Sequence, residues 1–172
     1  MKRFILFLIL SSALLPAADT APRRAPGFSI VDTHQQQHDL ADYRGKYVII
    51  DFMQTGCPHC IKFGETLEQL MIKYRGKLQA LSITLPPDNM GTATNYVKQH
   101  NVTIPVLYDL GQVAMSYLRP GPMNPTVHFP HVYLIDPAGN IVGDWEYTDI
   151  KPGIFEGDQF AKEIERVLGG KK

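Results

Sequence analysis

The sequence predicts one α/β domain in which helices cover both faces of a central mixed β-sheet. Two patterns carry this prediction. Apolar runs of strand length alternate with amphipathic helical segments, and the chain then ends in a strand pair and a final helix. Once the apolar N-terminus is set aside, about 150 residues remain, which is the size of one ordinary domain.

The predicted elements follow one another along the chain. A short hairpin is expected from Phe28 to Leu40, turning through the polar residues 34–37. Strands are then predicted at 47–53, 78–85, 106–108, 131–136 and 141–147, and helices at 58–74, 92–100, 111–118 and 160–168. Gly76 is expected to cap the first long helix, and residues 137–140 form the turn of the last hairpin.

The N-terminus indicates export. Lys2 and Arg3 precede an apolar stretch over residues 4–15, the pattern of a secretory signal peptide. This stretch is shorter than the roughly 20 residues that a spanning helix needs, so we expect cleavage near residue 18, with an uncleaved membrane anchor as the alternative. Residues 19–27 indicate a Pro-rich spacer and residues 28–170 the folded domain. The expected location is periplasmic or otherwise extracytoplasmic, in a bacterium.

The charge balance excludes one class of partner. Lys plus Arg and Asp plus Glu each number 17, so the formal net charge is +0. A neutral chain has no general attraction to nucleic acid or to anionic lipid. Nucleic acid is therefore not an expected partner, and a membrane is one only if the N-terminal segment stays attached.

The two cysteines of the chain, Cys57 and Cys60, are separated by Pro58 and His59. They lie where a predicted strand ends and a predicted helix begins, so the unpaired N–H groups and the dipole of the helix favour a thiolate at Cys57. Pro58 suits the first helical turn, and a protonated His59 adds positive charge beside the sulfur. We expect Cys57 to be the nucleophile and Cys60 to resolve the mixed disulfide.

Metal binding is the alternative use of this motif. A structural zinc site usually needs four ligands, and no second cysteine pair is present. A passive disulfide across so short a loop would constrain the unfolded chain little. Copper(I) held by the two thiolates and a histidine is a different class of function. The candidate histidines are His34, His38, His128 and His131. Isolated histidines in loops are more often surface residues than ligands, so no metal site is assigned.

Asp51 is unusual because it is a carboxylate inside the apolar run 48–53. Burying it ionised and unpaired would be costly, so it should be partly hydrated or have a raised pKa. A base of near-neutral pKa beside Cys60 would speed the resolving step. The alternative is an aspartate at an exposed strand end.

Together these features resemble the thioredoxin superfamily, and specifically the exported TlpA/ResA-like, or redoxin, branch. The matching residues are segments 28–32 and 40–46, the Cys57–Cys60 motif, and segment 132–136 with Gly139 and Ile141. The resemblance covers residues 28 to 168. It implies a thioredoxin fold with an N-terminal β-hairpin extension and a protein thiol-disulfide oxidoreductase. The Cys57–Cys60 disulfide would be the redox group, with no separate cofactor.

The resemblance also implies roles for individual residues. The family places a cis-proline directly before the penultimate strand, here Pro130, and packs it against the cysteine motif. The backbone of the preceding residue, here Phe129, would pair with the substrate chain like an added strand. A trans proline that ends a loop is the alternative. Phe129 departs from the small or β-branched residues common at this position. Asp51 has the spacing from Cys57 of the buried aspartate of thioredoxin.

The direction of the reaction stays open at this point. The Pro58-His59 dipeptide resembles that of disulfide-donating members, whereas the sequence on either side of the cysteine motif resembles the reductive branch. The expected partners are protein thiols and disulfides together with a redox-recycling protein, and we expect a monomer. A peroxiredoxin is disfavoured because its motif needs Pro and Thr where Ile50 and Gln54 stand.

Overall fold

The structure is a computed structural model that describes residues 23–122, 126–148 and 153–169. The predicted signal peptide over residues 1–18 and the start of the spacer lie outside the described residues. Among the helices of those three ranges, none is both long and apolar enough to cross a membrane.

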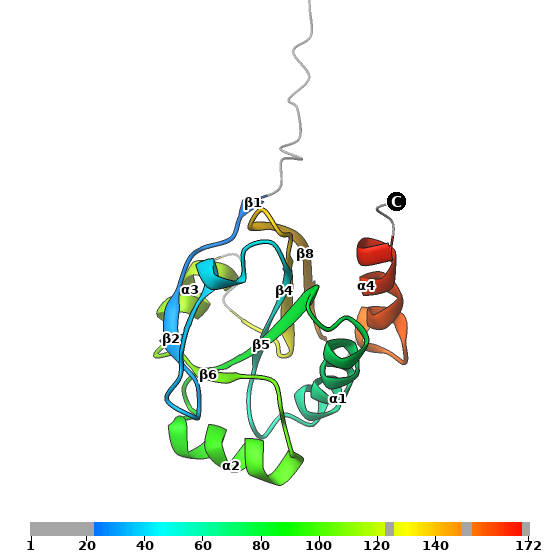
Figure 1. The fold of residues 1–172 in the computed structure, drawn as a ribbon. Coiled ribbons are helices and arrows are strands. Elements are labelled where there is room, and N and C mark those ends of the chain that lie inside the picture. The colour runs from blue at the N-terminus through cyan, green and yellow to red at the C-terminus, as the bar shows by residue number, and fades with distance from the viewer. Residues whose placement is uncertain (1–22, 123–125, 149–152, 170–172) are drawn as a thin grey trace, which may run out of the picture.

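A six-stranded mixed sheet forms the centre of the fold, in the order β1-β8-β7-β4-β5-β6 (Figure 1). The strands are β1 (Arg23–Arg24), β4 (Tyr47–Met53), β5 (Leu78–Thr84), β6 (Val106–Tyr108), β7 (His131–Ile135) and β8 (Asn140–Glu146). Strands β4, β5 and β6 are parallel, whereas β7, β8 and β1 add antiparallel pairs on the other side of β4. The cysteine motif follows β4, so it emerges from the middle of the sheet.

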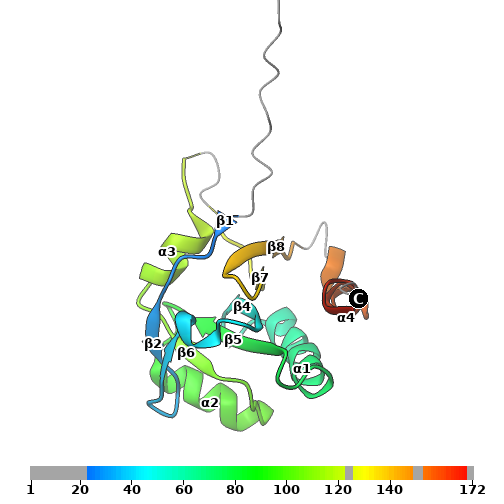
Figure 2. The same ribbon diagram turned by 45° about the horizontal axis from the view of Figure 1, so that its top comes forward.

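Helices cover both faces of this sheet, as the sequence predicts (Figure 2). They are α1 (Pro58–Lys73), α2 (Met90–His100), α3 (Gln112–Leu118) and α4 (Gln159–Gly169), with 3₁₀ turns η1 (Leu40–Tyr43) and η2 (Gly153–Phe155). On one face, α1 and α4 pack Leu67 and Phe160 against Ile49 of β4. On the other face, α3 packs Tyr117 against Phe52. The cysteine motif therefore lies at the start of a helix that covers the first of these two faces.

The predicted N-terminal hairpin is present as β2 (Ser29–Val31) and β3 (Gln37–Asp39), which pair antiparallel. Phe28 and Leu40 flank it and are buried in the core of the α3 face. Figure 2 shows the hairpin on the same side of the sheet as α3. The extension is thus part of the layer that covers this face.

The predicted spacer over residues 19–27 is corrected from Arg23 onward. Arg23 and Arg24 pair with Ile141 and Asn140 of β8, and the Ala25 N–H donates to the Gly139 carbonyl at 3.0 Å. Ala25 is itself buried. A two-residue edge strand has no apolar alternation, so the sequence carried no periodic signal for it.

The helix boundaries lie within two residues of the prediction, and two helix ends show the physical reason for a difference. Helix α2 begins at Met90 rather than Thr92, because Asn89 accepts hydrogen bonds from the N–H groups of Gly91 and Thr92 and caps the helix. At the end of α1 the C-cap is Tyr74, and the predicted cap Gly76 follows two residues later with φ +82°. That left-handed conformation suits glycine, so Gly76 still serves the chain reversal into β5.

Candidate functional site

Cys57 lies at the N-cap of α1, directly after the loop that follows β4. Its sulfur accepts a hydrogen bond from the Cys60 N–H at 3.2 Å, which is an interaction that a thiolate strengthens. The Cys57 side chain is half-buried, whereas Cys60 has no exposed surface. Both cysteines are free thiols in the structure. Only Cys57 can meet a partner without movement of the chain.

The loop before β7 faces the cysteine motif. The Cys57 thiol donates to the Phe129 carbonyl at 3.8 Å, and the Phe129–Pro130 peptide bond is cis. The Phe129 ring packs against the small cluster that contains Cys60. The structure therefore brings Cys57, Cys60, Phe129 and Pro130 together at one end of β4 and β7.

Asp51 lies within β4 and is 1% exposed, which rules out the exposed strand end. Its Oδ2 accepts a hydrogen bond from the Ser82 hydroxyl of β5 at 3.1 Å, whereas its Oδ1 has no partner among the described residues. Burial raises the pKa of Asp51 to about 7, against the opposing effect of the Ser82 bond. A carboxyl with such a pKa can both take up and release a proton near neutral pH.

Cys60 is electrostatically linked to Asp51. Burial raises the pKa of the Cys60 thiol far above its ordinary range, and the negative charge of Asp51 raises it further. Cys60 therefore holds its proton until a base removes it. Tyr96 of α2 packs in the same cluster, and its pKa is also raised, first by burial and then by the charges of Asp51 and Cys60. Tyr96 was not predicted as a site residue, because no local sequence pattern connects α2 with α1.

His59 projects from the motif onto Tyr147, which directly follows β8. The two rings stack with centroids 4.2 Å apart and an interplanar angle of 26°. A cavity of about 420 Å³ opens beside them. Its lining residues are His59, Lys62, Phe63, Thr66, Tyr147, Phe155, Glu156 and Gly157. The sequence alone does not connect position 147 with position 59.

The loop that carries Cys57 is held by Asp88, which the sequence analysis did not identify. The Asp88 carboxylate accepts hydrogen bonds from the backbone N–H and hydroxyl of Thr55 and from the hydroxyls of Thr84 and Thr92. Burial alone would raise the pKa of Asp88, but these donors outweigh it and hold the pKa below its ordinary value. The network joins the end of β5 and the start of α2 to the motif.

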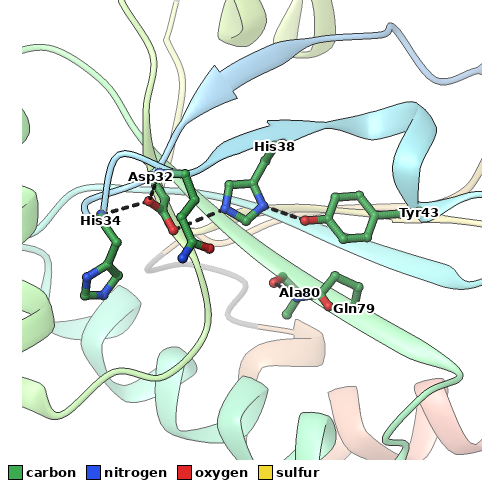
Figure 3. A network of polar contacts seen from close by, with 7 residues as sticks. Asp32, His34, His38, Tyr43, Gln79 and Ala80 are labelled. Carbon is green, nitrogen blue, oxygen red and sulfur yellow. Dashed lines mark hydrogen bonds and ion pairs between the residues drawn. The ribbon is translucent and has the colours of Figure 1, made fainter.

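A second buried carboxylate, Asp32, lies in the N-terminal hairpin (Figure 3). It accepts the N–H groups of His34 and Gln36 at 2.8 and 2.9 Å, and His38 Nε2 lies 3.1 Å from its other oxygen. His38 Nδ1 in turn lies 2.5 Å from the Tyr43 hydroxyl. The network closes the hairpin onto η1 and contains neither cysteine.

The histidines proposed as copper ligands include two with other partners. His38 is held by Asp32 and Tyr43, and His131 Nε2 lies 2.8 Å from Asp144. Over the described parts of the chain, no group of three or more His, Cys, Asp or Glu side chains is arranged to hold a metal ion.

The fold and the site define a redoxin of the thioredoxin superfamily, the class that contains the thiol-disulfide oxidoreductases. A family model described as the AhpC/TSA family matches residues 22–143, and the chain belongs to this family. Within it the chain is ResA-like, since several of its relatives carry that name.

Two of these relatives are proteins named "Thiol-disulfide oxidoreductase ResA". The one from Bacillus thuringiensis (strain Al Hakam) is 31% identical over 121 residues, or 70% of this chain and 66% of the relative. The one from Bacillus thuringiensis subsp. konkukian is 27% identical over 148 residues, or 85% of this chain and 75% of the relative. The chain thus spans just under two thirds of the first relative's length.

A solved structure shares the fold. The thioredoxin domain of a thiol-disulfide oxidoreductase from Bacteroides vulgatus superposes with a TM-score of 0.68 at 22% identity. The match covers 86% of this chain and 98% of that one. The predicted thioredoxin fold is therefore confirmed.

Proposed function

We propose that this protein exchanges disulfides with other proteins through Cys57 and Cys60. The observation that carries the proposal is the placement of the Cys57 sulfur between the Cys60 N–H and the Phe129 carbonyl, with the buried Cys60 directly behind it. A partner cysteine can approach Cys57 from solvent, and the Phe129 backbone is positioned to pair with the partner chain as an added strand.

In the reducing direction, the Cys57 thiolate attacks one sulfur of the partner disulfide. The partner S–S bond breaks, a Cys57–partner disulfide forms, and the first partner sulfur leaves as a thiolate that takes a proton from water. Cys60 then loses its proton and attacks the Cys57 sulfur, which forms the Cys57–Cys60 disulfide and releases the second partner thiolate. Two electrons pass to the partner. Oxidation of a partner dithiol is the same sequence in reverse.

Asp51 is proposed as the base for the second step. The pKa of Cys60 is raised by burial and by Asp51, so the proton needs an acceptor within the protein. Asp51 has a pKa of about 7, so it is partly ionised at neutral pH and can accept that proton.

Partners and location follow from the sequence. The signal-like residues 1–15 support an exported protein that meets its substrates outside the cytoplasm. We propose protein thiols and disulfides as substrates, a separate protein that recycles the Cys57–Cys60 pair, and a monomeric chain. A membrane would be involved only through an uncleaved N-terminal segment.

The trapping experiment tests the assignment of roles. Cys60→Ala should accumulate mixed disulfides on Cys57 when the protein is expressed in a bacterium and thiols are blocked on lysis. Cys57→Ala is the matched control and should trap nothing. Partners accumulating on Cys60 in the Cys57→Ala protein would reverse the roles, and no trapping in either variant would contradict protein substrates.

The direction is decided by the reduction potential of the pair. His59 supports a disulfide donor because a cation beside Cys57 stabilises the reduced form. The ResA-like sequence outside the cysteine motif supports a reductase. A reduction potential near that of known disulfide donors would contradict the reductase assignment. A strongly negative reduction potential would contradict the assignment as an oxidant.

Two further assays separate the alternative functions. Titration of the reduced protein with copper(I) should give no tight stoichiometric complex, since tight copper(I) binding with negligible disulfide exchange would make the chain a copper module. Hydrogen peroxide should be consumed slowly. Fast consumption that depends on Cys57 would establish a peroxidase.

A further inference from the structure

Helix α2 helps to bury Cys60. This cysteine has no exposed surface, and it packs in one buried cluster with Ala93 and Tyr96 of α2. Figure 2 shows α2 and α1 on the same side of the sheet. Gly64 of α1 permits a close approach of the two helices, because a Cβ there would lie 3.0 Å from the Tyr96 hydroxyl oxygen. Access to Cys60 therefore depends on where α2 is held.

Asp88 ties the start of α2 to the loop that carries Cys57. It lies in the connection between β5 and α2. Its carboxylate accepts a hydrogen bond from the Thr92 hydroxyl, in the first turn of α2, at 3.0 Å. It also accepts the N–H and the hydroxyl of Thr55 at 2.8 and 2.5 Å, and the hydroxyl of Thr84 at 2.6 Å. One carboxylate therefore links α2, the end of β5 and the loop after β4.

We propose that Asp88 is a positioning residue that holds α2 against Cys60, so that partner proteins react at Cys57 and not at Cys60. The proposal rests on the disulfide exchange proposed above. A mixed disulfide on Cys60 would reverse the roles of the two cysteines, because Cys57 would then have to resolve it. A covered Cys60 closes that route and keeps the order of the two exchange steps fixed.

The tie acts on the part of α2 that packs with Cys60. Thr92 is followed directly by Ala93 and, one turn later, by Tyr96, so a bond to the Thr92 hydroxyl fixes this part of the helix. Helix ends open locally at a lower free energy than the whole fold does, and the tie to the loop after β4 opposes such opening. Burial is the main cause of the raised pKa of Cys60, so water that enters on opening also raises the thiolate fraction.

Alkylation of Cys60 in a Cys57→Ala background measures the opening without a partner protein. The Cys60 thiolate displaces iodide from iodoacetamide, its proton goes to solvent, and mass spectrometry follows the product. Asp88→Ala should raise the alkylation rate at pH 8 about 10- to 100-fold, the factor expected for the loss of one or two hydrogen bonds. In a bacterium the same double variant should accumulate mixed disulfides on Cys60, whereas Cys57→Ala alone should trap nothing.

The dependence on urea separates local opening from global unfolding. Local opening exposes little surface, so the alkylation rate in Asp88→Ala should stay nearly constant between 0 and about 1 M urea. Global unfolding exposes far more surface, so a rate that it sets should rise about five-fold or more over the same range. A purely general loss of stability would therefore give a different result from the proposed role.

Asp109→Ala is the matched control for the carboxylate. Asp109 is also buried, and it accepts the N–H groups of Val113 and Ala114, which belong to α3 and pack in the core of the other face. Its loss should not raise the urea-independent alkylation rate of Cys60.

Two threonines of α2 provide a second matched pair. Thr92→Val removes the bond from the helix to Asp88 and should raise the alkylation rate, by less than Asp88→Ala does. Thr94→Val makes the same substitution on the same helix, where the hydroxyl donates to the Met90 carbonyl instead, and should leave the rate unchanged. If Asp88→Ala does not fold, as judged by circular dichroism, Asp88→Asn replaces it, with a smaller expected rise of about five-fold.

Three results would overturn the proposal: an unchanged alkylation rate in both Asp88 variants, a rise that appears only as urea is added, or the same urea-independent rise in Asp109→Ala. Failure of the proposed function is a different result. It would show as an absence of trapped proteins in Cys60→Ala, while the alkylation rates of Cys60 still differ between the variants.

Discussion

Asp51 and Asp32 each have almost no exposed surface, 1% and 3%, but Asp51 lies much deeper in the protein and the two carboxylates have different hydrogen-bond partners. Burial acts to raise the pKa of both. At Asp32 the Gln36 N–H, the His38 ring and the His34 N–H together outweigh burial and hold the pKa below its ordinary value. At Asp51 the Ser82 hydroxyl is the one donor among the described residues that opposes burial, and the pKa rises to about 7. The depth of burial and the number of donors together separate the two carboxylates.

The two residues also affect stability with opposite dependence on pH. Asp32 has a lowered pKa, so its stabilisation is present above the unfolded value near 4 and is lost as the pH falls below it. Asp51 has a raised pKa, so its ionisation costs stability as the pH rises from about 4 through 7. A fully satisfied carboxylate supports the fold, whereas an under-satisfied one is available for proton transfer.

The largest effect is expected from Asp32→Ala. It leaves two backbone N–H groups and His38 without their acceptor, so the free energy of unfolding should fall by roughly 3–5 kcal/mol at pH 7 in urea denaturation. Asp39→Ala is the control, because Asp39 accepts a single exposed N–H from Ala41 and its loss should cost about 1 kcal/mol. Equal losses in the two variants would show that the Asp32 network adds nothing.

Asp51→Asn should instead stabilise the reduced protein. The pKa of Asp51 is about 7 against an ordinary value of 3.8, and at about 1.36 kcal/mol per pKa unit the gain should be roughly 4 kcal/mol at pH 8 and close to none at pH 4. Urea denaturation at the two pH values measures it. A gain of the same size at both values would mean that ionisation of Asp51 is not its cause.

The same Asp51→Asn variant should slow the resolving step. With Cys57 loaded with a small cysteine peptide, release of the peptide by Cys60 at pH 7.5 should fall about 100-fold, because the proton acceptor is lost. Rapid quenching and mass spectrometry follow the release. Asp32→Asn should release the peptide at the wild-type rate, and a similar slowing there would point to a general loss of structure.

The smallest effect is expected from Ser82→Ala. Removing the Ser82 hydroxyl takes away the bond that lowers the pKa of Asp51, so the pH midpoint of peptide release should move up by less than about one unit. The rate at high pH should not change. Ser29→Ala, which makes the same substitution at an exposed hydroxyl, should leave the midpoint in place. A downward shift in Ser82→Ala would contradict the arrangement.

Much of the fold was predictable because its signals are local. Periodic apolar residues marked the four helices and the five long or buried strands, and the turn residues marked both hairpins. The two-residue strand β1 was missed, since pairing with β8 leaves no pattern in its own sequence. The 3₁₀ turns η1 and η2 were also missed, because segments of four and three residues are too short to show a helical period.

The site was predictable to a similar depth. Its cysteine pair follows from spacing, and the position of Asp51 in an apolar run led to the expectation of burial with a raised pKa. The partners of these residues were not predictable. Ser82 meets Asp51 through the register of β4 and β5, and Tyr147 meets His59 across the sheet.

By itself, the sequence determined that Cys57 lies where a strand ends and a helix begins, because the apolar patterns of the flanking residues predict both elements. It also determined that Asp51 sits in a run of apolar neighbours. Only the tertiary structure decided how deeply each carboxylate lies and which donors reach it, and therefore that the pKa of Asp32 is lowered while that of Asp51 rises to about 7. Burial can be inferred from local pattern, but hydrogen-bond partners come from residues that folding brings together from distant parts of the chain.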